Sequence, residues 1–166
     1  MEKQKMAPIT VGADQGKALS VVADTYRILV SGDQTNGEFA TIDMLIPPGG
    51  GPGPHAHPGF HETFYVISGA IELTSEAGTY IAGPGSYAVI PKGGMVHQFR
   101  NPTQSPAHLL CTVVPSGLEK MFLEIGEAAE WGQFLPPPSL DENNMQRMRA
   151  VAEKYGQTLY PPDFLK

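Results

Sequence analysis

Short apolar runs recur along the first 115 residues, and clusters of Gly, Pro, Asn or Ser separate them. The runs are rich in β-branched and aromatic residues and are between four and eight residues long, which is the usual length of a strand. Frequent turn residues between short strands are typical of a sandwich or barrel. The pattern therefore predicts an all-β fold for this part of the chain. The expected strands are residues 26–30, 39–46, 63–67, 71–74, 87–90, 97–100 and 108–114.

Beyond the last predicted strand, the spacing of the apolar residues changes from that of a strand to that of a helix. Leu118, Met121, Phe122 and Ile125 recur at the spacing of one helix face, which predicts an amphipathic helix over residues 118–131. Its apolar face must be covered, because exposed apolar area is unfavourable in water. We expect this helix either to pack on the outside of the β-structure or to lie across its open end.

A second helix is predicted over residues 140–155, after three prolines at 136–138 have stopped regular structure. Asp141 and Glu142 supply the acidic first turn that favours a helix N-terminus, and Gly156 supplies the residue that commonly follows a helix end. This helix has the same two possible placements as the first. Packing is the expected role of three large side chains in this region: Trp131, Met145 and Met148.

Composition indicates one globular domain without a nucleic-acid or membrane partner. Of 166 residues, 41% are hydrophobic, which suffices for a single packed core. The net charge of −6 offers no basic face for nucleic acid or an anionic membrane. The chain start lacks the apolar region of a signal peptide, and no apolar stretch reaches the ~18 residues of a membrane span, so a cytoplasmic protein is expected. The single cysteine, Cys111, is expected to be a buried, unreactive thiol.

Four residues have the types and spacing of a metal site built on strands. His55 and His57 are two apart, so their side chains point to the same side of a strand. Glu62 breaks this parity, but a turn at residues 58–59 would reset it, and His97 would come from a distant strand. Three imidazoles and one carboxylate suit a divalent Fe, Mn, Ni, Zn or Cu ion. The sequence therefore predicts one transition-metal ion held by these four residues.

These residues resemble the motifs of the cupin superfamily. The first motif matches at every specified position as Gly49-x5-His55-x-His57-x4-Glu62-x6-Gly69. The second resembles Gly85-x5-Pro91-x-Gly93-x3-His97-x3-Asn101, with one residue more before the histidine than the usual pattern has. The resemblance implies a jelly-roll barrel, or double-stranded β-helix, with the metal in its mouth. The resemblance covers residues 37–115, the expected barrel, and the pattern of the chain adds lead-in strands in residues 1–36 and a helical extension of the same domain in 116–166.

Within the cupins, the ligand set is similar to that of quercetinase-like dioxygenases. The resemblance implies a dioxygenase-like oxidoreductase that acts on a small apolar or aromatic compound with adjacent oxygen donors. A carboxylate ligand that swings away from the metal can also take a proton, so Glu62 is the expected catalytic base. The fold alone does not choose the activity. A metal-dependent isomerase and a non-catalytic small-molecule binding cupin remain the alternatives.

The side chains expected beside the metal are apolar. Phe64 and Phe99 each lie two residues after a predicted ligand and share its side of the strand, and Met95 lies within the second motif, so these three are the expected substrate pocket. His61 should point away from the metal, toward the surface or behind the ligands, and His108 is expected to be structural. Exposed edge strands of the barrel and the N-terminal segment predict a homodimer.

Overall fold

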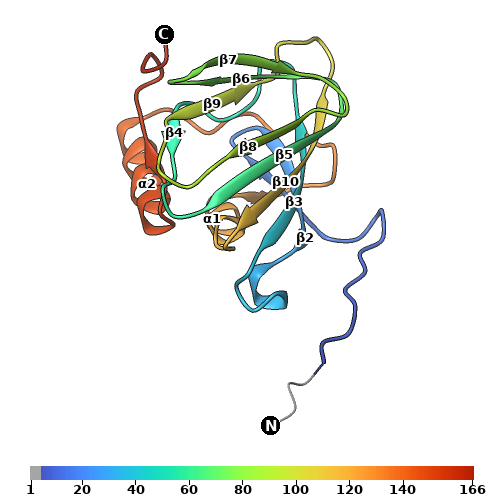
Figure 1. Cartoon of the computed structure of the whole chain (residues 1–166). Coiled ribbons are helices and arrows are strands. Elements are labelled where there is room, and N and C mark those ends of the chain that lie inside the picture. The colour runs from blue at the N-terminus through green and yellow to red at the C-terminus, as the bar shows by residue number, and fades with distance from the viewer. Residues whose placement is uncertain (1–4) are drawn as a thin grey trace.

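The computed structural model describes residues 5–166 and shows two antiparallel sheets that face each other as a jelly roll (Figure 1). A seven-stranded sheet has the order β11-β1-β2-β3-β10-β5-β8, and a five-stranded sheet has the order β12-β4-β9-β6-β7. The strands of the first sheet are β1 (Lys17–Val21), β2 (Asp24–Val30), β3 (Ala40–Ile46), β5 (His61–Ser68), β8 (Tyr87–Ile90), β10 (Ala107–Val114) and β11 (Glu127–Ala128). Those of the second are β4 (His55–Ala56), β6 (Ile71–Ser75), β7 (Gly78–Ala82), β9 (His97–Arg100) and β12 (Thr158–Leu159).

The alternation of side chains along the strands builds the core between the sheets. On β10, Ala107, Leu109, Cys111 and Val113 are fully buried, and the residues between them are partly exposed. This period of two places one face of each strand in the interior. The all-β barrel expected from the sequence is confirmed, as is the buried position of the Cys111 thiol.

A loop before β9 accommodates the additional residue of the second motif. Gly93 and Gly94 both have positive φ, 122° and 82°, a backbone conformation that residues other than glycine rarely adopt. The Gly93 amide donates to the Pro58 carbonyl at 3.2 Å, which fixes the loop beside the turn of the first motif. The chain then enters β9 with His97 directly opposite His55 of β4. The longer spacing therefore changes the loop and leaves the position of His97 intact.

The first helix, α1 (Leu118–Ile125), is shorter than the predicted 118–131. Gly126 ends it in an extended conformation, and the next residues form β11, which pairs with β1. The prediction was wrong beyond residue 125 because this pairing with a strand far away in sequence overrides the local helical spacing. The buried Glu119 carboxylate accepts from the amides of Gly32, at 2.8 Å, and Gly117, at 2.7 Å. It thereby joins the start of α1 to a short 3-10 helix, Gly32–Gln34.

The second helix, α2 (Glu142–Lys154), begins and ends close to where it was predicted. The Asp141 side chain accepts from the Asn144 amide at 3.0 Å, an N-cap that satisfies a free helix donor. Lys154 and Tyr155 donate to Glu124 of α1 at 2.7 and 2.6 Å, and β12 then pairs with β4. Both helices therefore cover the end of the barrel next to β4 (Figure 1). None of the helices in residues 5–166 has the length and hydropathy to cross a membrane.

The expected lead-in at residues 1–36 contains β1 and β2 and the 3-10 helix. Its first four residues lie outside the described part of the chain. The division at residues 36 and 115 stays a prediction.

Candidate metal centre

Three strands and a turn bring the four predicted ligands together. His55 is on β4, Glu62 on β5 and His97 on β9, and His57 precedes the turn at residues 58–59. All four are buried, and each offers a ligand atom within 4.8 Å of the others. The strand parity and the turn act as the sequence analysis expected, because the turn lets Glu62 face the same interior space as the two histidines.

Backbone carbonyls orient two of the imidazoles. Nδ1 of His55 bonds the Gly53 carbonyl at 2.8 Å, and Nδ1 of His97 bonds the Met95 carbonyl at 3.0 Å. A carbonyl only accepts, so both Nδ1 atoms donate, and each Nε2 keeps its lone pair for the interior. The third imidazole, His57, stacks on Phe60 with ring centroids 4.2 Å apart and an interplanar angle of 11°. Such contacts behind metal-ligating histidines fix ring orientation.

The site combines neutral imidazole with a charged carboxylate. Burial, together with the nearby His97, lowers the pKa of His55 to about 4, so its ring is neutral near pH 7. Burial by itself would raise the pKa of Glu62, but hydrogen bonds with His57 and His97 outweigh it and hold that pKa well below its usual range. Glu62 is therefore an anion within a buried cluster of nitrogen donors.

The donor atoms fit a metal ion. Nε2 of His57 lies 2.9 Å from Oε2 of Glu62 and 3.2 Å from Nε2 of His97. Two imidazole nitrogens at that distance can share only one proton, so at least one nitrogen lone pair of the pair faces the interior without a proton. A divalent cation would satisfy it and would offset the buried negative charge. The four residues thus form a cluster suited to a metal ion.

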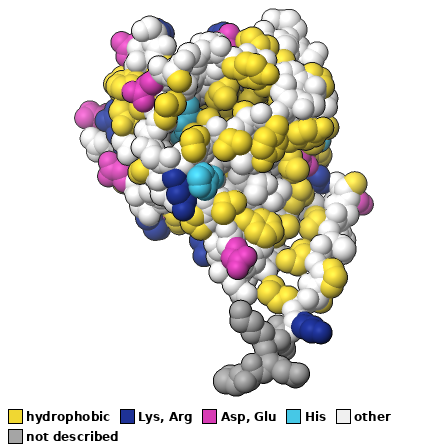
Figure 2. All heavy atoms as spheres, in the orientation of Figure 1, with side chains coloured by type: hydrophobic (Ala, Val, Ile, Leu, Met, Phe, Trp, Pro, Cys, Tyr) yellow, Lys and Arg dark blue, Asp and Glu magenta, His cyan; other side chains and the backbone are white. Residues whose placement is uncertain are grey.

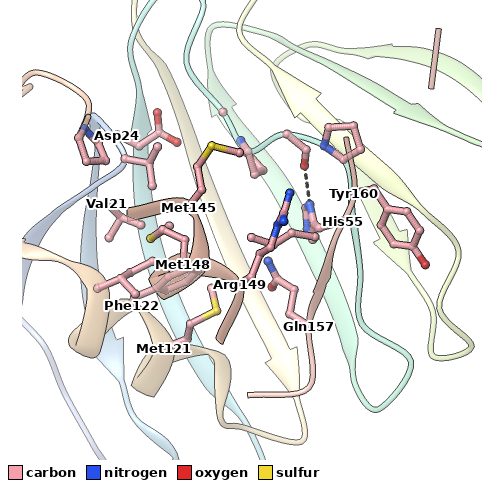
Figure 3. A pocket seen from close by; sticks show the side chains of 18 of the residues that line it. Val21, Asp24, His55, Met121, Phe122, Met145, Met148, Arg149, Gln157 and Tyr160 are labelled. Carbon is pink, nitrogen blue, oxygen red and sulfur yellow. Dashed lines mark hydrogen bonds between the residues drawn. The ribbon is translucent and has the colours of Figure 1, made fainter. Parts of the chain in front are cut away.

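A cavity of about 340 Å³ adjoins the cluster (Figure 3). His55 and Glu62 contribute to its wall, together with barrel residues of β2, β3 and β9. Its other wall comes from α1, α2 and the residues after α2, so the two helices lie across the mouth of the barrel. Most of the lining is apolar. The apolar side chains include Val21, Met44, Phe99, Leu118, Met121, Phe122, Ile125, Met145 and Met148.

The three residues predicted to form the pocket are in three different settings. Phe99 lines the cavity, and Phe64 packs behind it in the core, with ring centroids 5.0 Å apart. Met95 is not among the lining residues and is 45% exposed. It lies in the loop before β9, where strand parity does not apply, and it acts on the site through its backbone carbonyl. Met145 and Met148 line the cavity, although simple packing was expected for them.

Sequence reasoning missed Asp24 and Tyr26 at the start of β2. Asp24 contributes to the cavity wall and is only 2% exposed. Its Oδ2 accepts from the Tyr26 hydroxyl at 3.0 Å, and its Oδ1 has no hydrogen-bond partner. Burial raises the pKa of Asp24 to about 7, because hydrogen bonds with Tyr26 and with the Gly51 backbone offset the loss of hydration only in part. An acidic residue two positions before a tyrosine at the start of an apolar run was the available signal.

The two remaining histidines lie outside the cluster. Nδ1 of His61 accepts from the Lys92 amide at 3.2 Å on the outer side of β5. Nε2 of His108 is 2.5 Å from Asp43, which also pairs with Arg27 at 2.6 Å. His108 thus belongs to a polar group on the sheet.

Comparison with known proteins agrees with the motifs. Residues 42–113 match the family model described as Cupin domain. Quercetin 2,3-dioxygenase of Bacillus subtilis (strain 168) is 24% identical over 129 residues, which cover 78% of this chain and 37% of that protein. The chain thus spans little more than a third of this relative's length.

Two solved structures share the fold, each at 24% identity. A sugar phosphate isomerase of the cupin superfamily from Silicibacter pomeroyi has a TM-score of 0.55 and covers 65% of this chain and 76% of its own. A polyketide cyclase from Streptomyces resistomycificus has a TM-score of 0.58 and covers 67% of this chain and 81% of its own. The jelly roll, the motif residues and these similarities together support a single-domain cupin that resembles quercetinase-like proteins.

Proposed function

We propose that the protein is a metal-dependent, dioxygenase-like enzyme that acts on a small apolar or aromatic compound with adjacent oxygen donors. One observation carries the proposal: His55 and Glu62 of the ligand cluster form part of the wall of a largely apolar cavity. A ligand in that cavity would have its oxygen donors beside the metal and its apolar body against Phe99 and the methionines.

The four ligands would hold a single divalent transition metal. Such an ion supplies a Lewis acid for adjacent oxygen donors and, where it is redox-active, electrons for O2 chemistry. Glu62 has a second role in the proposal. Its carboxylate lines the cavity, and a carboxylate that swings away from the metal can take the proton that a ligand hydroxyl gives up. Its Oε1 is 3.7 Å from the Cys111 sulfur, and burial raises the pKa of that thiol, which therefore stays protonated.

The apolar wall supports an aromatic or otherwise planar ligand over a sugar. Apolar side chains exclude water from the space beside the ligands, so water competes less for open metal positions. A sugar would leave its hydroxyl groups without partners against Met44, Met121 and Phe122. A volume of about 340 Å³ is within the range of small-molecule sites.

Elemental analysis combined with O2 uptake tests the proposal. The purified protein is expected to contain about one transition-metal ion per chain and to consume O2 with at least one compound among flavonols, diketones and catechols. The His57→Ala protein serves as the metal-depleted control. Metal-loaded protein that consumes no O2 with any of these compounds would contradict the dioxygenase proposal. It would favour the isomerase or the binding cupin.

We also propose that the protein is a homodimer. Tyr65, Ile67, Tyr87 and Val89 form an apolar patch on β5 and β8, each between 43% and 61% exposed, and β8 is the edge of its sheet (Figure 2). Apolar surface at an exposed sheet edge favours association. The segment before β1 extends away from the barrel and could reach a neighbouring copy (Figure 1). Sedimentation at micromolar concentration should give about twice the 17.8 kDa chain mass, and a species at the chain mass would contradict the dimer. Cytoplasmic location stays a prediction.

A further inference from the structure

We infer that Arg149 and Gln157 bind a carboxylate of the ligand, so that the compound on which the protein acts is a planar organic acid. This inference rests on the proposed function, because it takes the metal cluster as the site of the ligand's adjacent oxygen donors. Arg149 is on α2 and Gln157 directly precedes β12, and both line the cavity that His55 and Glu62 also line. In Figure 3 both side chains point toward the part of the cavity that contains His55. A ligand held at the cluster would therefore have these two polar groups beside it.

Two elements fix the position of Gln157. Its backbone amide donates to the Ala152 carbonyl at 2.9 Å, which ties it to the end of α2. The strand that follows it, β12, pairs with β4, and Leu159 lies directly opposite His55 in that pairing. Gln157 is two residues before Leu159 and, like Leu159, lines the cavity. It is therefore held beside the strand that carries one of the four metal ligands.

The side-chain amide of Gln157 has no partner and can be reached from the cavity. The residue is only 7% exposed, yet its side chain makes no hydrogen bond within residues 5–166. The buried side-chain atoms that lack both a hydrogen bond and accessible surface belong to Asp24, Arg27 and His57. The Gln157 amide is not among them, so it keeps surface that opens on the cavity. An amide without a partner in an apolar wall is costly, and a ligand group would remove that cost.

Arg149 supplies an unpaired positive charge to the same wall. Arg27 and Arg100 form ion pairs at 2.6 and 3.3 Å, whereas Arg149 forms no ion pair and no hydrogen bond with the described part of the chain. A guanidinium is always charged in proteins, and its parallel N–H donors match the two oxygens of a carboxylate. A divalent ion with one carboxylate ligand would leave the cluster positive as well, so the cavity favours an anion. The N–H groups of Arg149 and of the Gln157 amide all donate, and a carboxylate supplies the acceptors.

The other polar side chains of the wall outside the metal cluster are placed differently. Asn144 and Ser139 both bond Asp141, at 3.3 and 2.7 Å. Oδ1 of Asp24 is enclosed, without accessible surface. The Tyr160 hydroxyl points away from the cavity in Figure 3. The guanidinium and the amide are therefore the free polar groups that a ligand beside the cluster can reach.

Probes of nearly equal shape test the inference on full-length protein loaded with Zn²⁺, which has no redox chemistry of its own. The first pair is 3,4-dihydroxybenzoate and 3,4-dihydroxybenzamide, which share the adjacent hydroxyl oxygens and differ in charge. The second pair, 3,4-dihydroxycinnamate and its amide, places the carboxylate farther from those oxygens. In calorimetric titrations the wild type is expected to bind the acid of at least one pair roughly tenfold more tightly than the amide, the effect of one charge-assisted hydrogen bond.

Replacing either group should remove most of this preference. Arg149→Met keeps the length of the side chain without its charge and should lower the preference to about twofold or less, and Gln157→Leu should lower it to about threefold. Arg147→Met is the matched control. Arg147 is on the same helix, is also unpaired within the described chain and lies outside the wall of the cavity, so this variant makes the same change of charge and should keep the tenfold preference.

If Gln157→Leu does not fold, Arg149→Met carries the test, because Arg149 is exposed and its replacement leaves the core intact. Failure of the wild type to bind any probe, equal binding of acid and amide in both pairs, a preference that persists in Arg149→Met, or one that is lost equally in Arg147→Met would overturn the inference. O2 uptake by protein loaded with a redox-active metal is measured separately. No uptake by a protein with the expected preference would contradict the proposed function and leave the assignment of Arg149 and Gln157 standing. Uptake without the preference would support the proposed function and overturn the assignment.

Discussion

The barrel wall and the tail wall of the cavity are built differently. The barrel wall contains His55, Glu62 and Phe99, which are buried on paired strands. The tail wall comes from α1, α2 and the residues after α2, and only Val151 and Ala152 of α2 are buried. Strand pairing over long sequence distances fixes side chains firmly, whereas a segment with few buried apolar contacts opens more readily.

In the proposed function, this difference separates metal binding from ligand selection. The groups suited to the metal all lie on the barrel side, where neighbouring strands restrict their movement. The tail contributes much of the apolar surface that a ligand would touch, including Met145 and Met148. Leu140, at the start of this wall, is 81% exposed and contributes little packing. In the proposed function, the barrel wall would set the chemistry, and the tail wall would select the compounds that bind.

Removing a barrel ligand should have the largest effect. His57→Ala or His97→Ala removes one of the three imidazole donors and leaves a void in the cluster, so metal content should fall from about one ion per chain to nearly none. Elemental analysis of dialysed protein measures the metal content per chain. His61→Ala is the matched control, because this side chain faces away from the cluster and should leave metal content unchanged. Metal lost in His61→Ala and retained in Glu62→Ala would overturn the assignment of Glu62 as a ligand.

Glu62→Gln should reduce turnover far more than it reduces metal content. The variant keeps the shape of the side chain and removes its charge and basicity, and three histidines can still hold a transition metal. Once a substrate has been identified, kcat measured with it is expected to fall by roughly 10²–10⁴-fold, the usual contribution of a general base. Metal content measured on the same samples should stay near that of the wild type. Full activity in Glu62→Gln would reject the role as a base.

Asp24 should make the stability of the protein fall as the pH rises. Its pKa is about 7 in the folded state against an ordinary value of 3.8, so between these values the folded protein keeps a proton that the unfolded chain releases. In Asp24→Asn this dependence is absent. The free energy of unfolding of the variant, relative to the wild type, should therefore increase between pH 4.5 and 7.5, by roughly 4 kcal/mol at most. Urea unfolding at both pH values measures it, and parallel pH profiles would contradict the raised pKa.

A charge in the tail wall should loosen the tail and spare the metal site. Val151→Asp places an unpaired carboxylate where α2 packs on the core, at a cost of about 2–3 kcal/mol. Hydrogen exchange should then show faster exchange in α2 and β12, with the barrel strands protected as before. Ala150→Asp, on the exposed side of the same helix, is the control and should change neither hydrogen exchange nor metal content. Loss of metal or of barrel protection in Val151→Asp would show that the two walls are not independent.

The ligand set could be predicted from the sequence because local rules place it. Strand parity aligns His55 with His57, and a turn of two residues restores the phase for Glu62. His97 was assigned through the second motif, and its position survives the longer loop because Gly93 and Gly94 absorb the additional residue.

Features that depend on residues far apart in the sequence could not be predicted from local patterns. The end of α1 is set by the pairing of β11 with β1, which no local spacing reveals. Met145 and Met148 have the pattern of an ordinary packed helix face, and only the position of α2 over the barrel mouth turns them into cavity residues. The burial of Asp24 depends on residues from both ends of the chain, which enclose the cavity beside it.

Anomalous diffraction from crystals of the purified protein, recorded at the absorption edge of the metal found by elemental analysis, would locate the metal ion. We expect one strong peak per chain, within about 2.0–2.3 Å of Nε2 of His55, His57 and His97 and of a carboxylate oxygen of Glu62. A peak at any other position, or metal-containing crystals without a peak among these four side chains, would contradict this expectation.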